Sequence, residues 1–211
     1  MPADALFWDK IAEKYSCSPI SDMAAYDRTL ERVTHYLRPD HRVLELGCGT
    51  GTTAVKLAPH VADMIATDVS QKMVDIGIGR AREAGVGNLR FAVAQPGTAP
   101  EGPFDVVTGF NLFHLLADQD QILEAVRQRL KPGGMFISKT PCLSDTRSAV
   151  KRLAIRLALP VMQRLGKAPS VVQFMTVAAW QRQIEAAGFE IVETGSYPDD
   201  IPNRFVVARR C

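Results

Sequence analysis

Three glycines stand at alternate positions directly after a short apolar segment, as Gly47, Gly49 and Gly51. Glycine allows a positive φ, and its missing side chain lets the backbone approach a ligand closely. Asp68 ends the next apolar segment, 23 residues after Glu45 (68 − 45 = 23). An ionised carboxylate at this place can accept hydrogen bonds from both hydroxyls of a ribose held over the glycine turn. These residues predict a site for a nucleoside-bearing ligand.

The segments around this site alternate between strands and helices. Short apolar runs predict strands at 42–46, 64–67, 89–93, 104–109 and 135–138. Helical spacing of apolar residues predicts helices at 52–58, 71–84 (with Ser70 as N-cap) and 118–130. Strands that alternate with helices form βαβ units and a parallel sheet. The glycine turn would then lie at the carboxyl end of a parallel strand, where open α/β sheets bind their ligands.

The two ends of the chain depart from this alternation. Apolar residues at helical spacing predict two N-terminal helices within 6–15 and 23–37, the second ended by Pro39. A helix at 178–187, stopped by Gly188, precedes strands at 189–194 and 205–208, which form a closing hairpin. This hairpin places one antiparallel strand at one side of the sheet. We therefore expect an α/β fold with a seven-stranded, mostly parallel, Rossmann-like sheet and helices on both faces.

Composition excludes several classes of function. The 25 basic and 23 acidic residues give a net charge of +2, so bulk charge indicates no nucleic-acid partner. The four cysteines are too far apart in sequence for a zinc knuckle or a CxxC motif, and we expect no metal. Neither an apolar signal segment at 1–10 nor an apolar run of about 18 residues is present. We expect a reduced, cytoplasmic protein.

The order of motifs gives a specific resemblance. VLELGCGTG at 43–51 resembles motif I of class I S-adenosylmethionine (SAM)-dependent methyltransferases, and ATDVS resembles their second motif. FDVVTGFNLFHLL, LKPGG and AAGFEIVE follow in the family's order. The likeness runs from Asp40 to the C-terminus apart from 140–176, and it is greatest to the small-molecule branch with ubiquinone/menaquinone C-methyltransferase-like proteins. Phe7-Trp8-Asp9, with Ala12 and Tyr15, is similar to the lid helix of that branch.

The resemblance implies one domain over 1–211. Its parts are N-terminal lid helices (1–38), a SAM-binding core (40–139), a substrate cap (140–176) and a C-terminal helix and hairpin (177–211). It also implies SAM as the cofactor and S-adenosylhomocysteine (SAH) as the product. The acceptor would be a small molecule, lipophilic or anionic, and the chain a monomer or homodimer.

Cofactor contacts follow residue by residue from the same resemblance. The glycine loop would pack on the methionine part of SAM, Glu45 would hold its amino group and Asp68 its ribose. Gln95 stands where the family has an aspartate near the adenine, and its amide oxygen can still accept a hydrogen bond. Three of these residues have an alternative role that needs no ligand. Met73 could be an ordinary core residue, and Trp8 and Tyr15 could be aromatic residues that pack the helix. The full set is Trp8, Tyr15, Glu45, Gly47, Cys48, Gly49, Asp68, Val69, Met73, Gln95, Pro96, Phe110 and Asn111.

The chemistry of a sulfonium cofactor demands little of the protein. SAM carries the reactive group, so the protein must orient the acceptor and exclude water. A base is needed only where the acceptor loses a proton, and His114 is the candidate on the loop after the fourth strand. Its alternative role is a hydrogen-bonded packing residue. Tyr15 is a second candidate for a catalytic role.

Three other assignments compete. A dehydrogenase fingerprint, GxGxxG, requires a third glycine at 52, where the chain has Thr52. The fourth strand ends in Gly109-Phe110-Asn111-Leu112, which lacks the Asn/Asp-Pro-Pro-Tyr/Phe motif of methyltransferases acting on nucleobase or glutamine amide nitrogens. A non-catalytic SAM-binding sensor or partner subunit on the same fold stays open because of Gln95.

The insertion at 140–176 fits no βα repeat. Its segment 146–165 is helix-compatible and apolar, and Asp145 is the only acid within 140–176. We expect a cap that walls the acceptor pocket and supplies an arginine for an anionic group. An amphipathic helix whose cations face water, or docking on a membrane surface, are the alternatives. The cations of this segment are Arg147, Lys151, Arg152, Arg156 and Arg164.

Overall fold

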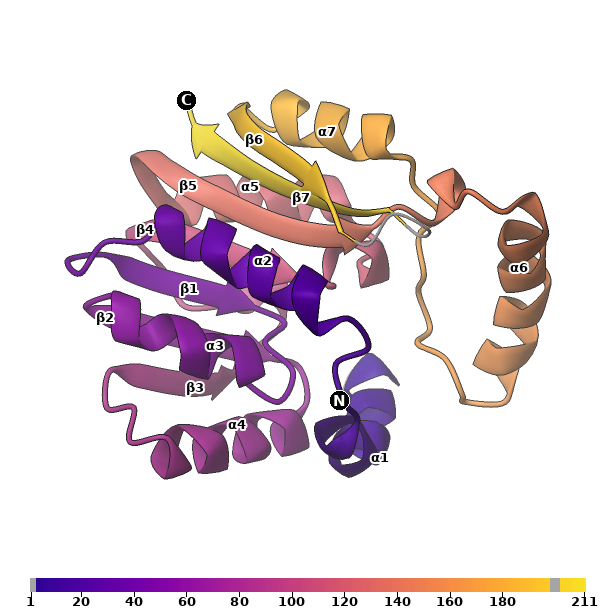
Figure 1. Cartoon of the computed structure of the whole chain (residues 1–211), viewed down its shortest axis with the longest axis horizontal. Coiled ribbons are helices and arrows are strands. Elements are labelled where there is room, and N and C mark those ends of the chain that lie inside the picture. The colour runs from indigo at the N-terminus through magenta and orange to yellow at the C-terminus, as the bar shows by residue number, and fades with distance from the viewer. Residues whose placement is uncertain (1–2, 198–201) are drawn as a thin grey trace.

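A seven-stranded sheet forms the centre of the molecule, and helices lie on both of its faces (Figure 1). The computed structural model describes residues 3–197 and 202–211. The strands are β1 (Arg42–Leu46), β2 (Asp63–Asp68), β3 (Leu89–Val93), β4 (Phe104–Phe110), β5 (Leu130–Pro141), β6 (Phe189–Ser196) and β7 (Asn203–Arg210), in the order β3-β2-β1-β4-β5-β7-β6. Strand β7 runs antiparallel to β5 and β6, whereas the pairs β1–β2, β1–β4, β2–β3 and β4–β5 are parallel. The predicted α/β fold with one antiparallel strand is confirmed, and β6 rather than β7 forms the edge.

Two apolar cores lie on opposite faces of the sheet because neighbouring residues of a strand point in opposite directions. Leu44 of β1 packs with Leu123 and Trp180 on one face, and Val43 packs with Val33 and Leu57 on the other. The first core is covered by α5 (Gln119–Arg129) and α7 (Val177–Ala186). The second is covered by α2 (Met23–His35), α3 (Thr52–Leu57) and α4 (Gln71–Glu83). Two helices stand outside this arrangement: α1 (Ala3–Cys17) and α6 (Ala149–Arg164).

Some predicted boundaries differ from the observed ones. Strand β5 begins at Leu130, not at 135, because Leu130 already pairs with Phe104, and a bulge precedes the pair Val106–Met135. Helix α2 ends at His35, ahead of Pro39, and the N–H of Tyr36 closes its last turn. Ser70 caps α4 as predicted, since its side chain accepts from the N–H of Met73. The predicted turn between the last two strands lies partly outside the described residues.

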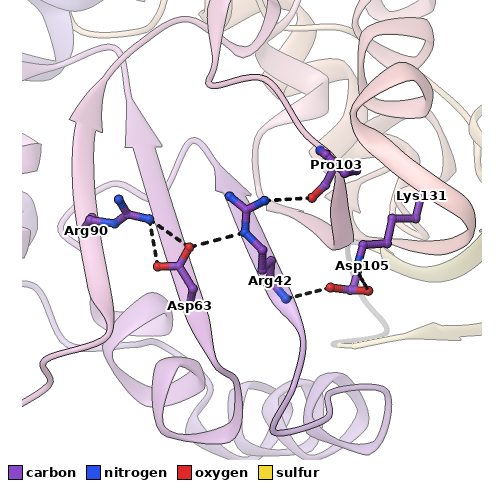
Figure 2. A network of polar contacts seen from close by, with 6 residues as sticks. All are labelled: Arg42, Asp63, Arg90, Pro103, Asp105 and Lys131. Carbon is purple, nitrogen blue, oxygen red and sulfur yellow. Dashed lines mark hydrogen bonds and ion pairs between the residues drawn. The ribbon is translucent and has the colours of Figure 1, made fainter.

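Charged side chains tie the amino ends of the strands together (Figure 2). Asp63 of β2 accepts hydrogen bonds from Arg90 of β3, and the Nε of Arg42 lies 3.7 Å from its Oδ2. Asp105 of β4 accepts from the N–H of Arg42 at 2.8 Å and from Lys131 at 2.6 Å. Exposed ion pairs of this kind contribute about 0–1 kcal/mol each. They link β1, β2, β3, β4 and β5 at the amino ends of the parallel strands.

The carboxyl ends of β1, β2 and β4 lie side by side at the opposite end of the strands. Register pairs Leu46 with Thr67 on one side and with Gly109 on the other. Gly47, directly after β1, therefore lies between Asp68 at the end of β2 and Phe110 at the end of β4. From β1 the chain continues to β2 on one side, and it later returns to form β4 on the other side of β1. The carboxyl ends of β1 and β4 therefore form the topological switch point, where open α/β sheets bind ligands.

Candidate functional site

A cavity of about 810 Å³ lies at the carboxyl ends of β1, β2 and β4, between the glycine loop after β1 and helix α1. All thirteen residues predicted for cofactor binding line it: Trp8, Tyr15, Glu45, Gly47, Cys48, Gly49, Asp68, Val69, Met73, Gln95, Pro96, Phe110 and Asn111. Met73 is also almost fully buried, so its two predicted roles coincide at one position. The structure brings these residues together, and their roles in binding stay predictions.

The glycine loop has a backbone that side chains would strain. Gly47 and Gly49 have φ of 63° and 54°. A Cβ on Gly47 would lie 2.7 Å from Cδ1 of Leu112, a contact that forces a neighbour to move. A Cβ on Gly49 would meet only the Tyr15 ring, at 3.8 Å. The face of Gly49 is therefore open to the cavity, as a backbone that cradles a ligand requires.

Asp68 connects this loop with the end of β2. Its Oδ2 accepts a hydrogen bond from the N–H of Gly49, and its Oδ1 accepts one from the N–H of Ser70, both at 2.9 Å. Burial raises the pKa of Asp68 above its ordinary value, and these backbone N–H groups offset part of that rise. Each carboxylate oxygen has more than one acceptor position. The carboxylate can therefore accept further hydrogen bonds from a ligand.

Glu45 lies beneath the loop with an unsatisfied oxygen. Its side chain is only 2% exposed, and Oε2 has no hydrogen-bond partner among the described residues. Burial, followed by the nearby charge of Asp68, raises the pKa of Glu45 to about 8. An unpaired buried carboxylate is costly unless a cation or donor reaches it. The amino group of SAM is a cation of this kind, so the residues present fit the expected cofactor.

Helix α1 is held over the cavity by hydrogen bonds from its first turn and from its middle. Asp4 accepts hydrogen bonds from the N–H and the hydroxyl of Ser170, at 3.1 and 2.6 Å. Asp9 accepts from the hydroxyl of Ser70 at 2.6 Å, beside the start of α4. Trp8 and Tyr15 stack edge to face, with ring centroids 6.4 Å apart. These contacts place the aromatic side of α1 against the glycine loop.

Arg80 of α4 joins α1 to the glycine loop. Its guanidinium donates to the carbonyl of Ser16 at 2.8 Å and to the carbonyl of Thr50 at 3.1 Å. It also donates to the hydroxyls of Thr50 and Thr52. Arg80 lines the cavity. One half-buried arginine thus contacts both the glycine loop and helix α1.

Asn111 has an unusual backbone at the end of β4. It is the one non-glycine residue with positive φ, 53°, within the described part of the chain. Its N–H donates to the carbonyl of Lys139 on β5 at 2.7 Å. A strained conformation of this kind persists where its surroundings fix it, and such positions cluster at functional sites. This geometry supports a functional role for Asn111.

The two predicted catalytic side chains have different placements. His114 lies in the 3-10 helix η3 (Phe113–Leu115) and is not among the residues that line the cavity. Burial lowers its pKa to about 4, so its imidazole is neutral at neutral pH. Tyr15 does line the cavity, and burial followed by the charge of Asp68 raises the pKa of its hydroxyl. A catalytic role stays a prediction for both.

Cys48 is a neutral thiol in this setting. Burial, with the charges of Glu45 and Asp68, raises its pKa well above the ordinary value. A thiolate is the nucleophilic form of cysteine. The loop cysteine therefore offers shape to the site and no competing nucleophile.

Several residues of the cavity were not singled out from the sequence. They include Tyr26 of α2, whose hydroxyl lies 3.4 Å from that of Thr53, and Lys56, whose Nζ lies 4.9 Å from the Tyr26 ring centre. Thr53 could have been expected, because it stands in the first turn of the helix that follows the glycine loop. Arg80 gave no signal, since an arginine in an amphipathic helix ordinarily faces water.

The insertion contributes little to the cavity. Pro169 is the residue of 140–176 that lines it, and α6 supplies none of the lining within the described residues. The prediction that this helix walls an acceptor pocket with an arginine stays a prediction.

Comparison with known proteins gives consistent matches. Residues 20–194 match the family model described as a methyltransferase domain. An uncharacterized methyltransferase of Bacillus subtilis is 30% identical over 160 residues, which are 71% of this chain and 57% of that protein. A ubiquinone/menaquinone biosynthesis C-methyltransferase of Vibrio campbellii is 35% identical over 106 residues, 47% of this chain and 41% of that protein. The chain thus spans about half the length of these curated relatives.

One solved structure illustrates the agreement in fold. Magnesium protoporphyrin IX methyltransferase from Synechocystis, solved with bound SAH, superposes with a TM-score of 0.71 at 18% identity. The match covers 99% of this chain and 96% of that one. The shared architecture includes the sheet and the helices that surround it.

Proposed function

This chain belongs to the SAM-dependent methyltransferase family, and on that premise we propose that its methyl acceptor is a small molecule with an apolar part. One observation carries the proposal: the cavity does not end at the glycine loop. It continues to Leu112, Leu115 and Leu116 after β4, where apolar side chains form its wall. Its volume of about 810 Å³ falls in the range of small-molecule sites.

In this proposal the glycine loop and two acids hold the cofactor. Glu45 binds the amino group, Asp68 accepts from the ribose hydroxyls, and Val69, Met73, Gln95 and Pro96 surround the adenine. SAM supplies an electrophilic methyl group on its sulfonium, so the protein needs no nucleophile of its own. The neutral thiol of Cys48 fits this requirement.

The remaining residues of the site orient the acceptor and exclude water. Trp8 and Tyr15 on α1 cover the loop, and Phe110 and Asn111 stand between the cofactor residues and the leucine wall. Fixing the acceptor in one orientation removes entropy from the barrier, and this effect is worth several kcal/mol in well-oriented reactions, about 7–11 at most. Because His114 does not line the cavity, an acceptor that must lose a proton can use its imidazole as a base only through a rearrangement of η3.

A turnover assay over acceptor classes tests the proposal. The full chain is incubated with methyl-labelled SAM and separate pools of phenols, quinols, amines and carboxylic acids. Labelled product and SAH are then measured by mass spectrometry, with a reaction that lacks the chain as the blank and Asp68→Ala as a variant whose SAM binding should be weakened. We expect SAH formation that depends on one apolar pool. SAM binding without turnover in any pool would favour the non-catalytic sensor on the same fold.

A further inference from the structure

The outward face of α6 is apolar over most of its length. Val150, Leu153, Leu157, Val161 and Leu165 follow at intervals of three or four residues, so they share one side of the helix. Their exposed fractions are 78, 58, 67, 58 and 62%. We call these five residues the outer stripe. None of the residues of α6 is buried.

The opposite face of α6 turns to the rest of the chain and fixes the helix in this orientation. Ile155, Leu159 and Gln163, which lie on that side, are half-buried. The side-chain amide of Gln163 donates to the carbonyls of Pro169 and Ser170, both at 3.0 Å. Arg156 lies over the ring of Phe174 at 5.5 Å. The outer stripe therefore points away from the protein because the inner face is held by the returning segment.

Charge is segregated in the same region. Residues 146–176 contain six cations and no Asp or Glu: Arg147, Lys151, Arg152, Arg156, Arg164 and Lys167. The rest of the chain then has 19 basic and 23 acidic residues (25 − 6 = 19), a net charge of −4 against +6 here. At about 100° per residue, Lys151 stands on one flank of the outer stripe and Arg156 on the other, while Arg164 lies within the arc of the stripe at the C-terminal end of the helix. Basic side chains flank the stripe on both sides.

We propose that α6 docks in the surface of a bilayer that contains anionic lipid, with the outer stripe among the acyl chains and the flanking cations at the headgroups. An apolar face with lysine and arginine beside it is the pattern of helices that lie in the membrane plane. Long basic side chains can bury their stems and keep their charges at the phosphates. Within the described residues no helix is long and apolar enough to cross a bilayer, so α6 would lie on the membrane.

Pairing of two α6 helices from separate copies fits the charges less well. Each helix would bring the same four cations to the contact, Lys151, Arg152, Arg156 and Arg164, and like charges at an interface are unfavourable. Anionic headgroups complement the +6 segment, and the −4 body would be repelled from the same surface. The net effect is an orientation in which α6, beyond the carboxyl ends of the strands, meets the membrane first (Figure 1).

Vesicle co-sedimentation tests the proposal in the absence of SAM, so its outcome is independent of the proposed function. The full chain is mixed with vesicles of phosphatidylcholine alone or of phosphatidylcholine with phosphatidylserine. We expect binding to the anionic vesicles that weakens as salt is added. Leu153→Ser with Leu157→Ser removes the centre of the outer stripe without changing charge, and we expect at least about a tenfold loss of binding.

Two further variants separate the contributions. Ile78→Ser with Val192→Ser is the matched control, since these residues are 41% and 40% exposed on other elements. It should bind as the unaltered chain does. Arg164→Glu with Lys167→Glu should lose binding to anionic vesicles while keeping the outer stripe.

Two results would overturn the proposal. One is a folded chain, by circular dichroism, that stays in the supernatant with anionic vesicles. The other is equal binding by the Leu153→Ser, Leu157→Ser variant. Sedimentation velocity without vesicles covers the remaining case: a dimer that this variant converts to monomer would assign the stripe to contact between copies and contradict membrane docking.

Discussion

The backbone N–H of Gly49 donates a 2.9 Å hydrogen bond to Oδ2 of Asp68. One hydrogen bond thus connects the loop after β1 with the acid that ends β2, before any ligand contributes. The same carboxylate accepts from Ser70 at the start of α4. Asp68 therefore positions the loop as well as offering oxygen atoms to the cavity.

Asp68→Ala should weaken SAM binding by roughly 1.5–3 kcal/mol, the scale of a hydrogen bond to a charged group. Isothermal titration with SAM measures this change. Asp63→Ala is the matched control, because Asp63 is an acid at the opposite end of the same strand. Equal dissociation constants for the Asp68 variant and the unaltered chain would show that the ribose lies elsewhere.

Glu45→Gln should stabilise the ligand-free protein at high pH. The pKa of Glu45 is about 8 in the folded state against an ordinary 4.5, so the folded state binds more protons between these values. Its contribution to stability is present below pH 4.5 and is lost as the pH rises to about 8, with a slope of up to about 1.4 kcal/mol per pH unit. Urea unfolding across this window should show that slope for the unaltered chain and a flatter profile for the glutamine variant.

The same substitution should weaken SAM binding. A cationic amino group favours the ionised form of Glu45, so the affinity of the unaltered chain should fall as the pH is lowered from about 8. The glutamine variant should bind more weakly and lose this pH dependence. An unchanged pH profile in the variant would mean that Glu45 does not contact the cofactor.

Gly49→Ala should cost binding as well as stability. Gly49 and Gly85 both have positive φ, 54° and 67°, so alanine at either should destabilise the fold by about 1–2 kcal/mol. A Cβ on Gly85 meets nothing within 4 Å, whereas that on Gly49 faces Tyr15 across the cavity. Only the Gly49 variant should lose affinity for SAM in titration. Comparable affinity in the two variants would place the cofactor away from the loop.

How far the sequence predicted the site depends on how local each signal is. The site rests on three signals: three glycines between a strand and a helix, an acid at the end of the next strand, and the Ser70 cap. Each signal can be recognised from a few neighbouring residues. The structure places Gly47, Gly49 and Asp68 on one cavity as that pattern predicts. The strands were predicted from the same kind of local pattern. Their predicted boundaries were wrong at ends such as Leu130, where pairing with the neighbouring strand decides the boundary.

Contacts between distant segments were not predictable in this way. Arg80 reaches Ser16, 64 residues away, and Asp9 reaches Ser70, 61 residues away. Neither pairing has a local signal, since both depend on how α1 packs against α4 in the folded chain. The amphipathic pattern of α6 likewise showed that the helix has an apolar face, but only its contacts with the returning segment showed that this face points outward.

Arg80→Ala should loosen α1 over the cavity. Its guanidinium donates hydrogen bonds to the carbonyls of Ser16 and Thr50. Loss of these hydrogen bonds should speed SAH dissociation about tenfold. Stopped-flow displacement measures that rate, and hydrogen exchange should rise across α1. Arg82→Ala, an exposed position on the same helix, is the control. Unchanged dissociation in the Arg80 variant would show that α1 does not gate the site.

The location of the cofactor is tested most directly by a crystal structure of the chain grown with SAH. The account predicts SAH lying across Gly47–Gly51, with its ribose hydroxyls within hydrogen-bond distance of the Asp68 carboxylate and its amino group beside Glu45. Density for SAH outside this cavity, or a ribose turned away from Asp68, would contradict it.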